Sequence, residues 1–396
     1  MIVDRVRKAM ARMGFGGFGG GSPGAAGAPP QGPGLPPTQI RSHRSELLDC
    51  IRAVAITMVV VYHTSIAHGT AFADMDPIQQ FFRLRGMHGV DIFFPLSGYL
   101  IAVFLMTSTR PDFIRVFFLR RVFRIVPLYM VAVTIAAAGI LATGVDRHLL
   151  DRIWVAYTFL TAWVVHFEGR NVVPYEITWS LSVEEFAYIL FGLMAWWRRS
   201  WLPAFFLFTT ALAIAIKLDL ASRGEGFYFL PLARLDSIAI GGLTAWLFVR
   251  GKYPLLVLGG AFVASQVVSA LSPVASIALT YTDVSLAVGF LIVVFERWGR
   301  NLRTAVTGNV AAIGFYSYFT YLFHVFVIGG LYVVIERSGY VPPPFWIMAV
   351  VVLAVTHAAA VVSYRVFEGP MMRFGRRFET PAKASRFPAP EARDRT

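Results

Sequence analysis

The chain has 396 residues, of which 56% are hydrophobic and only 15% are charged, and its formal net charge is +13. The hydrophobic share lies above, and the charged share well below, those of water-soluble globular domains, so an ordinary soluble enzyme or binding module is excluded. The single cysteine, Cys50, also excludes a framework of internal disulfides. The composition therefore indicates a chain that folds within a lipid bilayer.

Residues 1–44 join a short basic stretch to a run rich in glycine and proline. Such a segment cannot bury enough apolar surface to fold, so we expect a disordered, basic cytoplasmic tail. A secretory signal peptide would carry its apolar run directly after a short basic stretch. The first apolar run of this chain is therefore expected to stay in the protein as a membrane span.

A membrane-spanning helix needs about 20 mainly apolar residues. An eleventh apolar stretch, residues 153–166, is short for a span, and the arginine clusters of the chain fall on one side of the membrane only if it does not cross. We therefore predict an all-α polytopic membrane protein with both termini in the cytoplasm and a re-entrant or surface-lying segment at 153–166. The ten predicted spans are 47–67, 87–107, 125–145, 177–197, 201–219, 229–249, 254–272, 276–295, 311–335 and 343–366.

Ionisable residues inside a bilayer are costly and usually face a protein interior or a wet cavity. Arg52 and His63 are eleven residues apart, close to three helical turns, so they share one face of the first span with Asp49. At a rise of about 1.5 Å per residue, Arg52 lies roughly 8 Å and His63 roughly 24 Å from the cytoplasmic end. Further ionisable residues are expected at about the depth of His63 and would form a layer around it: Asp91, Glu184, Glu185, Arg234, Asp236 and His324.

Structural explanations stand beside these functional ones. Arg234 and Asp236 could simply neutralise each other, and an intramembrane histidine is often only a hydrogen-bonding packing residue. Five arginines in a predicted cytoplasmic loop before the third span are what membrane orientation alone demands. The same cluster would also bind a phosphate-bearing donor. Its members are Arg110, Arg115, Arg120, Arg121 and Arg124.

Seven strings, taken in chain order, resemble the segments of the membrane-bound acyltransferase family 3. The resemblance runs from about residue 45 to 373, and it implies an acyltransferase membrane domain followed by a disordered tail at 374–396. Many relatives carry a C-terminal hydrolase-like domain, so the resemblance implies the stand-alone form here. The strings are LLDCIRAVAITMVVVYHTS, GVDIFFPLSGYLI, RRVFRIVPLYMV, ITWSLSVEEFAYILFGL, RLDSIAIGGLTAWL, YSYFTYLFHVFVI and YRVFEGPMMR.

The resemblance also implies roles for individual residues. Arg52 and His63 correspond to the essential pair of the first helix, with His63 as general base or transient acyl carrier. We expect Asp91 or Glu184 to orient the His63 imidazole, which makes these four the catalytic set. The expected donor-binding set is Arg115, Arg120, Arg121, Arg124 and Tyr129. The expected acceptor-binding set is Trp179, Ser180, Glu185, His324, Arg234 and Asp236.

The activity implied by the resemblance is O-acylation. The co-substrate would be acyl-coenzyme A, acetyl-coenzyme A above all, used in the cytoplasm without a metal ion. The acceptor would be a hydroxyl of a carbohydrate such as an exopolysaccharide, a lipopolysaccharide or another surface glycan. The implied location is the bacterial inner membrane, with membrane lipid and proteins of polysaccharide biosynthesis or export as partners, and no nucleic acid.

Two alternatives remain open at this point. A proton-coupled secondary transporter would use the same buried histidine and carboxylates as a proton relay. A non-catalytic subunit of a polysaccharide export system would need neither the histidine nor the carboxylates for its function. Release of free coenzyme A by the purified protein would distinguish the enzyme from both.

Overall fold

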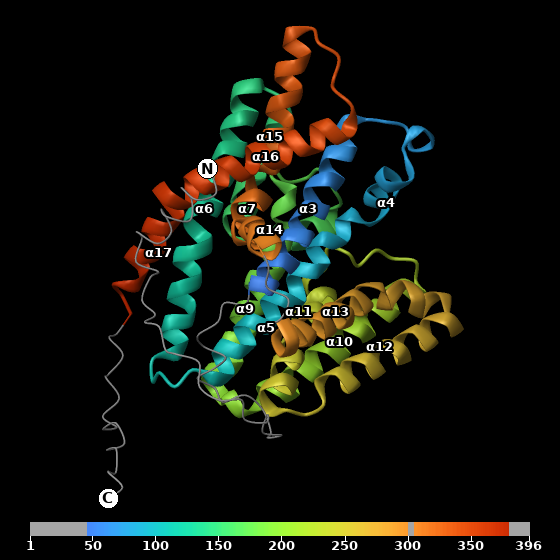
Figure 1. Ribbon diagram of the computed structural model, residues 1–396, viewed down its shortest axis with the longest axis vertical. Coiled ribbons are helices and arrows are strands. Elements are labelled where there is room, and N and C mark those ends of the chain that lie inside the picture. Colours follow the sequence, from blue (N-terminus) through green and yellow to red (C-terminus); the bar gives the residue numbers. More distant parts are fainter. Residues whose placement is uncertain (1–45, 300–304, 380–396) are drawn as a thin grey trace, which may run out of the picture. The chain divides into compact units, whose positions relative to one another are not determined.

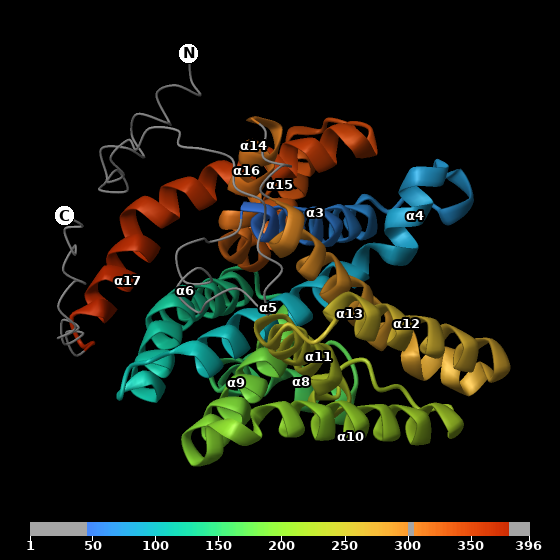
Figure 2. The same ribbon diagram turned by 60° about the horizontal axis from the view of Figure 1, so that its bottom comes forward.

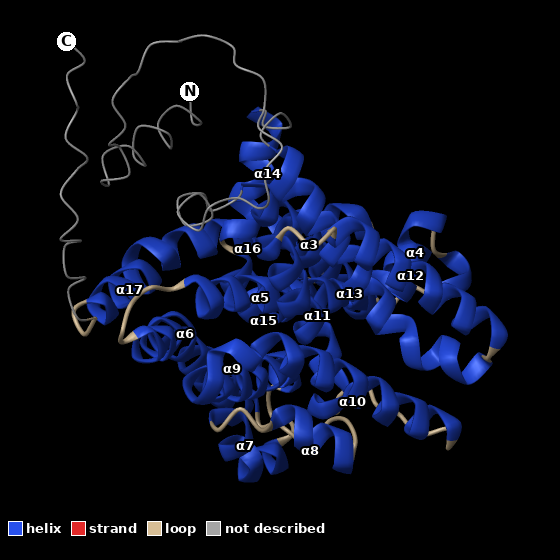
Figure 3. Ribbon diagram, turned by 90° about the horizontal axis from the view of Figure 1, so that it is seen from below, coloured by secondary structure: helices blue, strands red, loops and turns tan. Residues whose placement is uncertain are grey.

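The computed structural model describes residues 46–299 and 305–379. The tail predicted at 1–44 therefore lies outside the described residues, as do residues 380–396 of the tail predicted at 374–396. Every regular element within the described ranges is a helix, as Figure 3 shows. The all-α prediction is therefore confirmed for this part of the chain.

Nine continuous helical stretches of the described chain are long and apolar enough to span a membrane. The longest, Glu176–Ser222, contains two α-helices of 20 and 21 residues joined by the short turn η6 (Arg199–Trp201). Each of these two is long enough to cross alone. The predicted span 311–335 runs from the end of the short α14 (Ala305–Phe315) into α15, and each of the other nine corresponds to one α-helix of this multi-pass membrane protein. Ten long helices therefore match the ten predicted spans. These helices are α3 (Glu46–His68), α5 (Gly89–Thr107), α6 (Phe113–Thr143), α9 (Trp179–Arg198), α10 (Leu202–Ser222), α11 (Pro231–Arg250), α12 (Pro254–Leu271), α13 (Pro273–Trp298), α15 (Ser317–Ser338) and α16 (Phe345–Ser363).

Proline and glycine set several helix limits. Helices α11, α12 and α13 begin with Pro231, Pro254 and Pro273, since the first helical turn needs no amide donor at that position. Helix α6 ends at Gly144, whose φ of 74° closes the last turn in the left-handed region. The limits of these helices therefore follow from local sequence.

The arginine-rich segment differs from its prediction, because it is helical and not a loop. Helix α6 begins at Phe113, twelve residues before the predicted span, so four of the five arginines project from one continuous helix and only Arg110 precedes it. The C-terminal helix α17 (Gly369–Arg376) packs along it, and the rings of Phe123 and Phe378 stack at 5.7 Å. This packing also orders residues 374–379, where the sequence predicted a disordered tail.

The segment at 153–166 forms two short helices, α7 (Ile153–Tyr157) and α8 (Thr161–Glu168), separated by Phe159 with a φ of 58°. Neither helix is long enough to cross a bilayer, which agrees with the predicted partial segment. Tyr129 of α6 holds the break in place, since its hydroxyl donates to the carbonyl oxygen of Ala156 at 2.6 Å.

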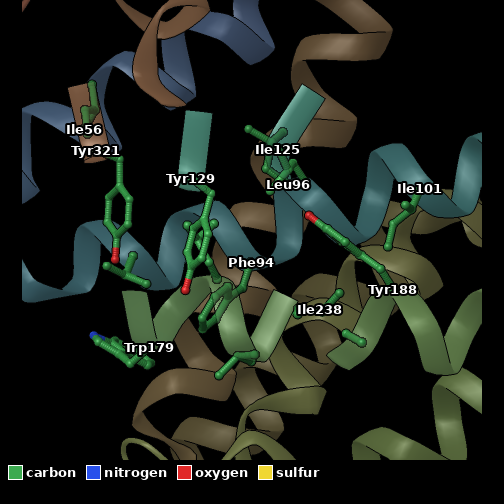
Figure 4. Close-up of a cluster of buried hydrophobic side chains, with 14 of the residues drawn as sticks. Ile56, Phe94, Leu96, Ile101, Ile125, Tyr129, Trp179, Tyr188, Ile238 and Tyr321 are labelled. Atoms are coloured by element: carbon green, nitrogen blue, oxygen red, sulfur yellow. The ribbon is translucent and has the colours of Figure 1, made fainter. Parts of the chain in front are cut away.

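Most of the long helices belong to two groups that pack within themselves. Helices α10, α11, α12 and α13 pack against one another (Figure 1), and α3 packs against α5, α15, α16 and the short α14 (Ala305–Phe315; Figure 2). Helices α5 and α11 approach most closely at two glycines: a side chain at Gly98 would overlap the Ile238 carbonyl, and one at Gly241 would overlap the Pro95 carbonyl. Buried aromatic and aliphatic side chains fill the space beside this crossing (Figure 4).

Candidate active site

A cavity of about 260 Å³ opens between α3, α5, α6, α9 and α15. Its polar wall contains four arginines and one carboxylate, and we call it the arginine cavity. Aromatic and aliphatic side chains complete the wall, so the cavity offers apolar surface beside the charges. The polar members are Arg52, Ser97, Arg120, Arg121, Arg124, Ser180, Glu184, Tyr188, Ser317, Tyr318 and Tyr321.

The four arginines differ in their pairing. Arg52 forms an ion pair with Asp49, one turn before it on α3. Arg120 donates two hydrogen bonds of 2.7 Å to the carboxylate of Glu379, which lowers the pKa of that carboxyl group. Arg121 and Arg124 have no ion-pair partner among the described residues. These two guanidinium groups are therefore available to an anion that enters the arginine cavity.

Glu184 belongs to the wall of the arginine cavity and does not contact His63. Its two oxygens accept hydrogen bonds from Ser97 Oγ at 2.9 Å and from the Tyr188 hydroxyl at 2.7 Å. The guanidinium of Arg121 lies 3.7 Å from the centre of the Tyr188 ring. Ser97 and Tyr188 were missed in the sequence, where a serine and a tyrosine in apolar spans carry no distinguishing signal.

His63 contacts a second histidine instead. His324 of α15 places its Nε2 atom 3.2 Å from His63 Nδ1, and their ring centres are 4.9 Å apart. His63 Nδ1 also lies 2.9 Å from the carbonyl oxygen of Val59. We call these two residues the histidine pair. The sequence predicted both histidines at a similar depth in the membrane but placed His324 in the set that binds the acceptor substrate.

One residue of the arginine cavity wall, Tyr321, lies close to the histidine pair. Tyr321 lines the cavity and lies one helical turn before His324, with 6.2 Å between their ring centres. Its hydroxyl donates to the carbonyl oxygen of Ile177 at 2.6 Å and lies 2.6 Å from Ser180 Oγ. Ser180 therefore helps to hold a tyrosine that contributes to the cavity wall one helical turn before His324.

Asp91 lies elsewhere, and the prediction that it orients His63 is wrong. Its carboxylate forms an ion pair with Arg234 and a 2.7 Å contact with His88 Nδ1. Both Asp91 and Arg234 are fully buried, and the Arg234 guanidinium lies 4.0 Å from the centre of the Tyr281 ring. This carboxylate is occupied in neutralising a buried arginine.

Arg234 and Asp236 form no ion pair with each other in the described structure, unlike in the structural explanation considered from the sequence, and each pairs with a different residue. Asp236 accepts hydrogen bonds of 2.6 Å from Lys217 Nζ and from Thr282 Oγ1. Lys217 and Asp236 are both fully buried. None of these residues lines the arginine cavity, so they tie α10, α11 and α13 together rather than form part of it. Lys217 was not among the predicted residues, although a lysine inside a predicted span is a visible signal.

The remaining predicted residues separate into those inside and those outside the arginine cavity. Trp179 packs against the rings of Tyr228 and Phe229 at 4.8 and 5.2 Å and is not part of the cavity wall. Tyr129 is buried against the 153–166 segment, and Arg115 is exposed on the first turn of α6. Glu185 lies beside the cavity residues on α9, with one buried oxygen that has no hydrogen-bond partner in the described chain.

Comparison with known proteins identifies the family of the chain. The acyltransferase domain family Acyl_transf_3 matches residues 46–365. An O-acetyltransferase of Staphylococcus aureus strain COL, so named provisionally, is 28% identical over 37% of this chain and 24% of its own length. A provisionally named membrane-bound transacylase of Komagataeibacter xylinus, BcsY, is 25% identical over 57% of each chain. The peptidoglycan O-acetyltransferase OatA of Listeria monocytogenes is 26% identical over 36% of this chain and 23% of its own.

The chain thus spans about a quarter of the length of the staphylococcal and listerial relatives and about half that of BcsY. No solved structure matches it. The family match covers most of the chain and includes both the arginine cavity and the histidine pair. This protein therefore belongs to the membrane-bound acyltransferase family 3.

Proposed function

We propose that this chain is an O-acyltransferase that moves an acyl group, acetyl above all, from cytoplasmic acyl-coenzyme A to a carbohydrate hydroxyl. The observation that supports this proposal most is that helix α3 links the arginine cavity to the histidine pair. Arg52 lines the cavity, and His63 lies eleven residues further along the same helix, roughly 16 Å away along its axis. A donor held by its phosphates at one end of this line can present its thioester at the other.

The donor phosphates would bind where guanidinium charge is available. Arg121 and Arg124 supply charge-assisted donors, and Arg52 is held on the wall of the arginine cavity by its ion pair with Asp49. The apolar remainder of the wall suits the uncharged arm of coenzyme A. Arg115 is exposed outside the cavity and has no part in this proposal.

His63 would act as the general base. The acceptor oxygen bonds to the thioester carbonyl carbon while its proton passes to His63. The tetrahedral intermediate then expels the coenzyme A sulfur, and the C–S bond breaks. The proton on His63 goes to that sulfur, so the enzyme returns to its starting state with an ester and a free thiol as products.

The names of the relatives support a carbohydrate acceptor. OatA is named for the O-acetylation of peptidoglycan, and the staphylococcal relative is named an O-acetyltransferase. We propose a glycan hydroxyl reached from the outer side of the bacterial inner membrane. A cell-surface glycan would then carry the ester.

The test compares cells with and without the protein by mass spectrometry of ester groups on surface glycans. Glycan from cells without the protein then serves as acceptor for purified protein and acetyl-coenzyme A, with free thiol as the readout. We expect thiol release to need both substrates and to fall at least about 100-fold in His63→Ala. The matched control is His357→Ala, a histidine on spanning helix α16 outside the arginine cavity and the histidine pair.

The outcomes separate the alternatives. Thiol release equal to that of the wild type in His63→Ala, with the variant inserted normally, would remove His63 from the reaction. No release at all with any glycan would favour a transporter or a non-catalytic subunit. One equivalent of thiol released before the glycan is added would make His63 an acyl carrier rather than a base.

A further inference from the structure

We propose that His324 is a positioning residue that selects the tautomer of His63 and so leaves His63 Nε2 as the atom that takes the acceptor proton. This inference rests on the proposed function. It assigns to a neutral histidine the orienting role that the sequence analysis gave to Asp91 or Glu184.

The first step concerns the proton on His324. Its Nδ1 atom lies 2.8 Å from the carbonyl oxygen of Tyr321 and 3.1 Å from that of Thr320. Carbonyl oxygens only accept hydrogen bonds, so Nδ1 must carry the proton of a neutral imidazole. His324 Nε2 is then an acceptor with its lone pair directed at His63.

The second step concerns the proton on His63. Its Nδ1 atom faces two acceptors, the Val59 carbonyl oxygen at 2.9 Å and His324 Nε2 at 3.2 Å. Only a protonated Nδ1 satisfies both of them. The lone pair of a neutral His63 is therefore on Nε2, which has no hydrogen-bond partner among the described residues.

The third step concerns why His324 stays in place. Its side chain is fully buried, and the turn before it is held from two sides. The Tyr321 hydroxyl donates to the Ile177 carbonyl, and the Tyr175 hydroxyl donates to the Leu322 carbonyl. Burial raises the pKa of Tyr175 well above its ordinary value, so that hydroxyl remains a donor.

A neutral acceptor also suits this depth in the protein. A carboxylate beside His63 would be a buried charge whose transfer from water is expensive unless a cation pairs with it. Asp91 and Glu184 are the two carboxyl groups that the sequence suggested for this place, and each is hydrogen-bonded elsewhere. A neutral imidazole accepts a hydrogen bond from His63 Nδ1 without that cost. The same hydrogen bond stabilises the cation that forms when His63 takes a second proton on Nε2.

Three substitutions separate positioning from packing. In His324→Gln an amide oxygen reaches about as far as Nε2 does and still accepts from His63 Nδ1. In His324→Asn the amide ends near the position of Nδ1, and in His324→Phe the ring is kept without an acceptor. We expect kcat to fall roughly 10- to 100-fold in the asparagine and phenylalanine variants and to recover at least partly in the glutamine variant. The KM for acetyl-coenzyme A should not change, because His324 does not line the arginine cavity.

The measurement is steady-state thiol release from acetyl-coenzyme A with glycan from cells lacking the protein, on full-length protein in lipid nanodiscs. A wild-type kcat in His324→Phe, or a glutamine variant no better than asparagine, overturns the inference. Should the phenylalanine variant fail to accumulate, the comparison of glutamine with asparagine still decides it. Failure of the proposed function looks different, since wild-type protein would then release no thiol.

Discussion

Arg124 tests whether the arginine cavity binds the donor phosphates. It lines the cavity, and no carboxylate of the described chain pairs with it. Replacing Arg124 by glutamine removes a charge-assisted hydrogen bond, which is worth about 1.5–3 kcal/mol when the partner is a phosphate. Because Arg124 is exposed, solvent screens the contact and the lower value applies. That value corresponds to a roughly tenfold rise in KM for acyl-coenzyme A, with kcat nearly unchanged because the histidine pair is untouched.

The assay is thiol release at increasing acetyl-coenzyme A, with a saturating glycan acceptor and at two salt concentrations. The matched control is Arg115→Gln, which removes an exposed arginine from the same helix outside the arginine cavity. The control should keep the wild-type KM. Equal KM values for the two variants, or a loss confined to kcat in Arg124→Gln, would refute donor binding in this cavity.

Two further predictions concern buried and peripheral ion pairs. In Lys217→Met, Asp236 loses its buried cation, and we expect a loss of about 3–5 kcal/mol in stability, measured as the thermal midpoint of detergent-solubilised protein. The double variant Lys217→Met/Asp236→Leu should regain most of it, and a double variant as unstable as the single one would contradict this reasoning. In Glu379→Gln, Arg120 loses its carboxylate partner and becomes available to a phosphate, so KM for acetyl-coenzyme A should fall a few-fold; an unchanged KM would show that Arg120 does not meet the donor. The pKa of Glu379 is lowered in the folded protein. Its ion pair with Arg120 therefore stabilises the fold at a pH above the ordinary carboxyl pKa, and this stabilisation is lost as the pH falls through the pKa of the folded protein.

Much of the architecture was predictable because its signals are local. Apolar runs of span length and first-turn prolines mark the helices. The 3.6-residue period places Arg52 and His63 on one face of α3 without any knowledge of its neighbours. The start of α6 was predicted too late, because a hydropathy pattern shows where a helix becomes apolar and not where it begins.

The partners of the charged residues were not predictable in the same way. A rise per residue gives the depth of a side chain along its helix, but contact also depends on which helices are neighbours and how each is rotated. Asp91 was predicted near the depth of His63 yet pairs with Arg234, 143 residues away in sequence. His63 meets His324 across 261 residues, and Arg120 meets Glu379 across 259.

The sequence alone therefore determined that this chain spans the membrane many times and carries an arginine–histidine face on α3, because length, hydropathy and helical period are properties of single segments. Only the tertiary structure decided that a histidine, and not a carboxylate, contacts His63. It also decided which arginines face the arginine cavity without an ion-pair partner among the described residues. The physical reason is that buried charges pair with whatever packing brings within hydrogen-bond distance, and packing between distant helices is a property of the whole fold.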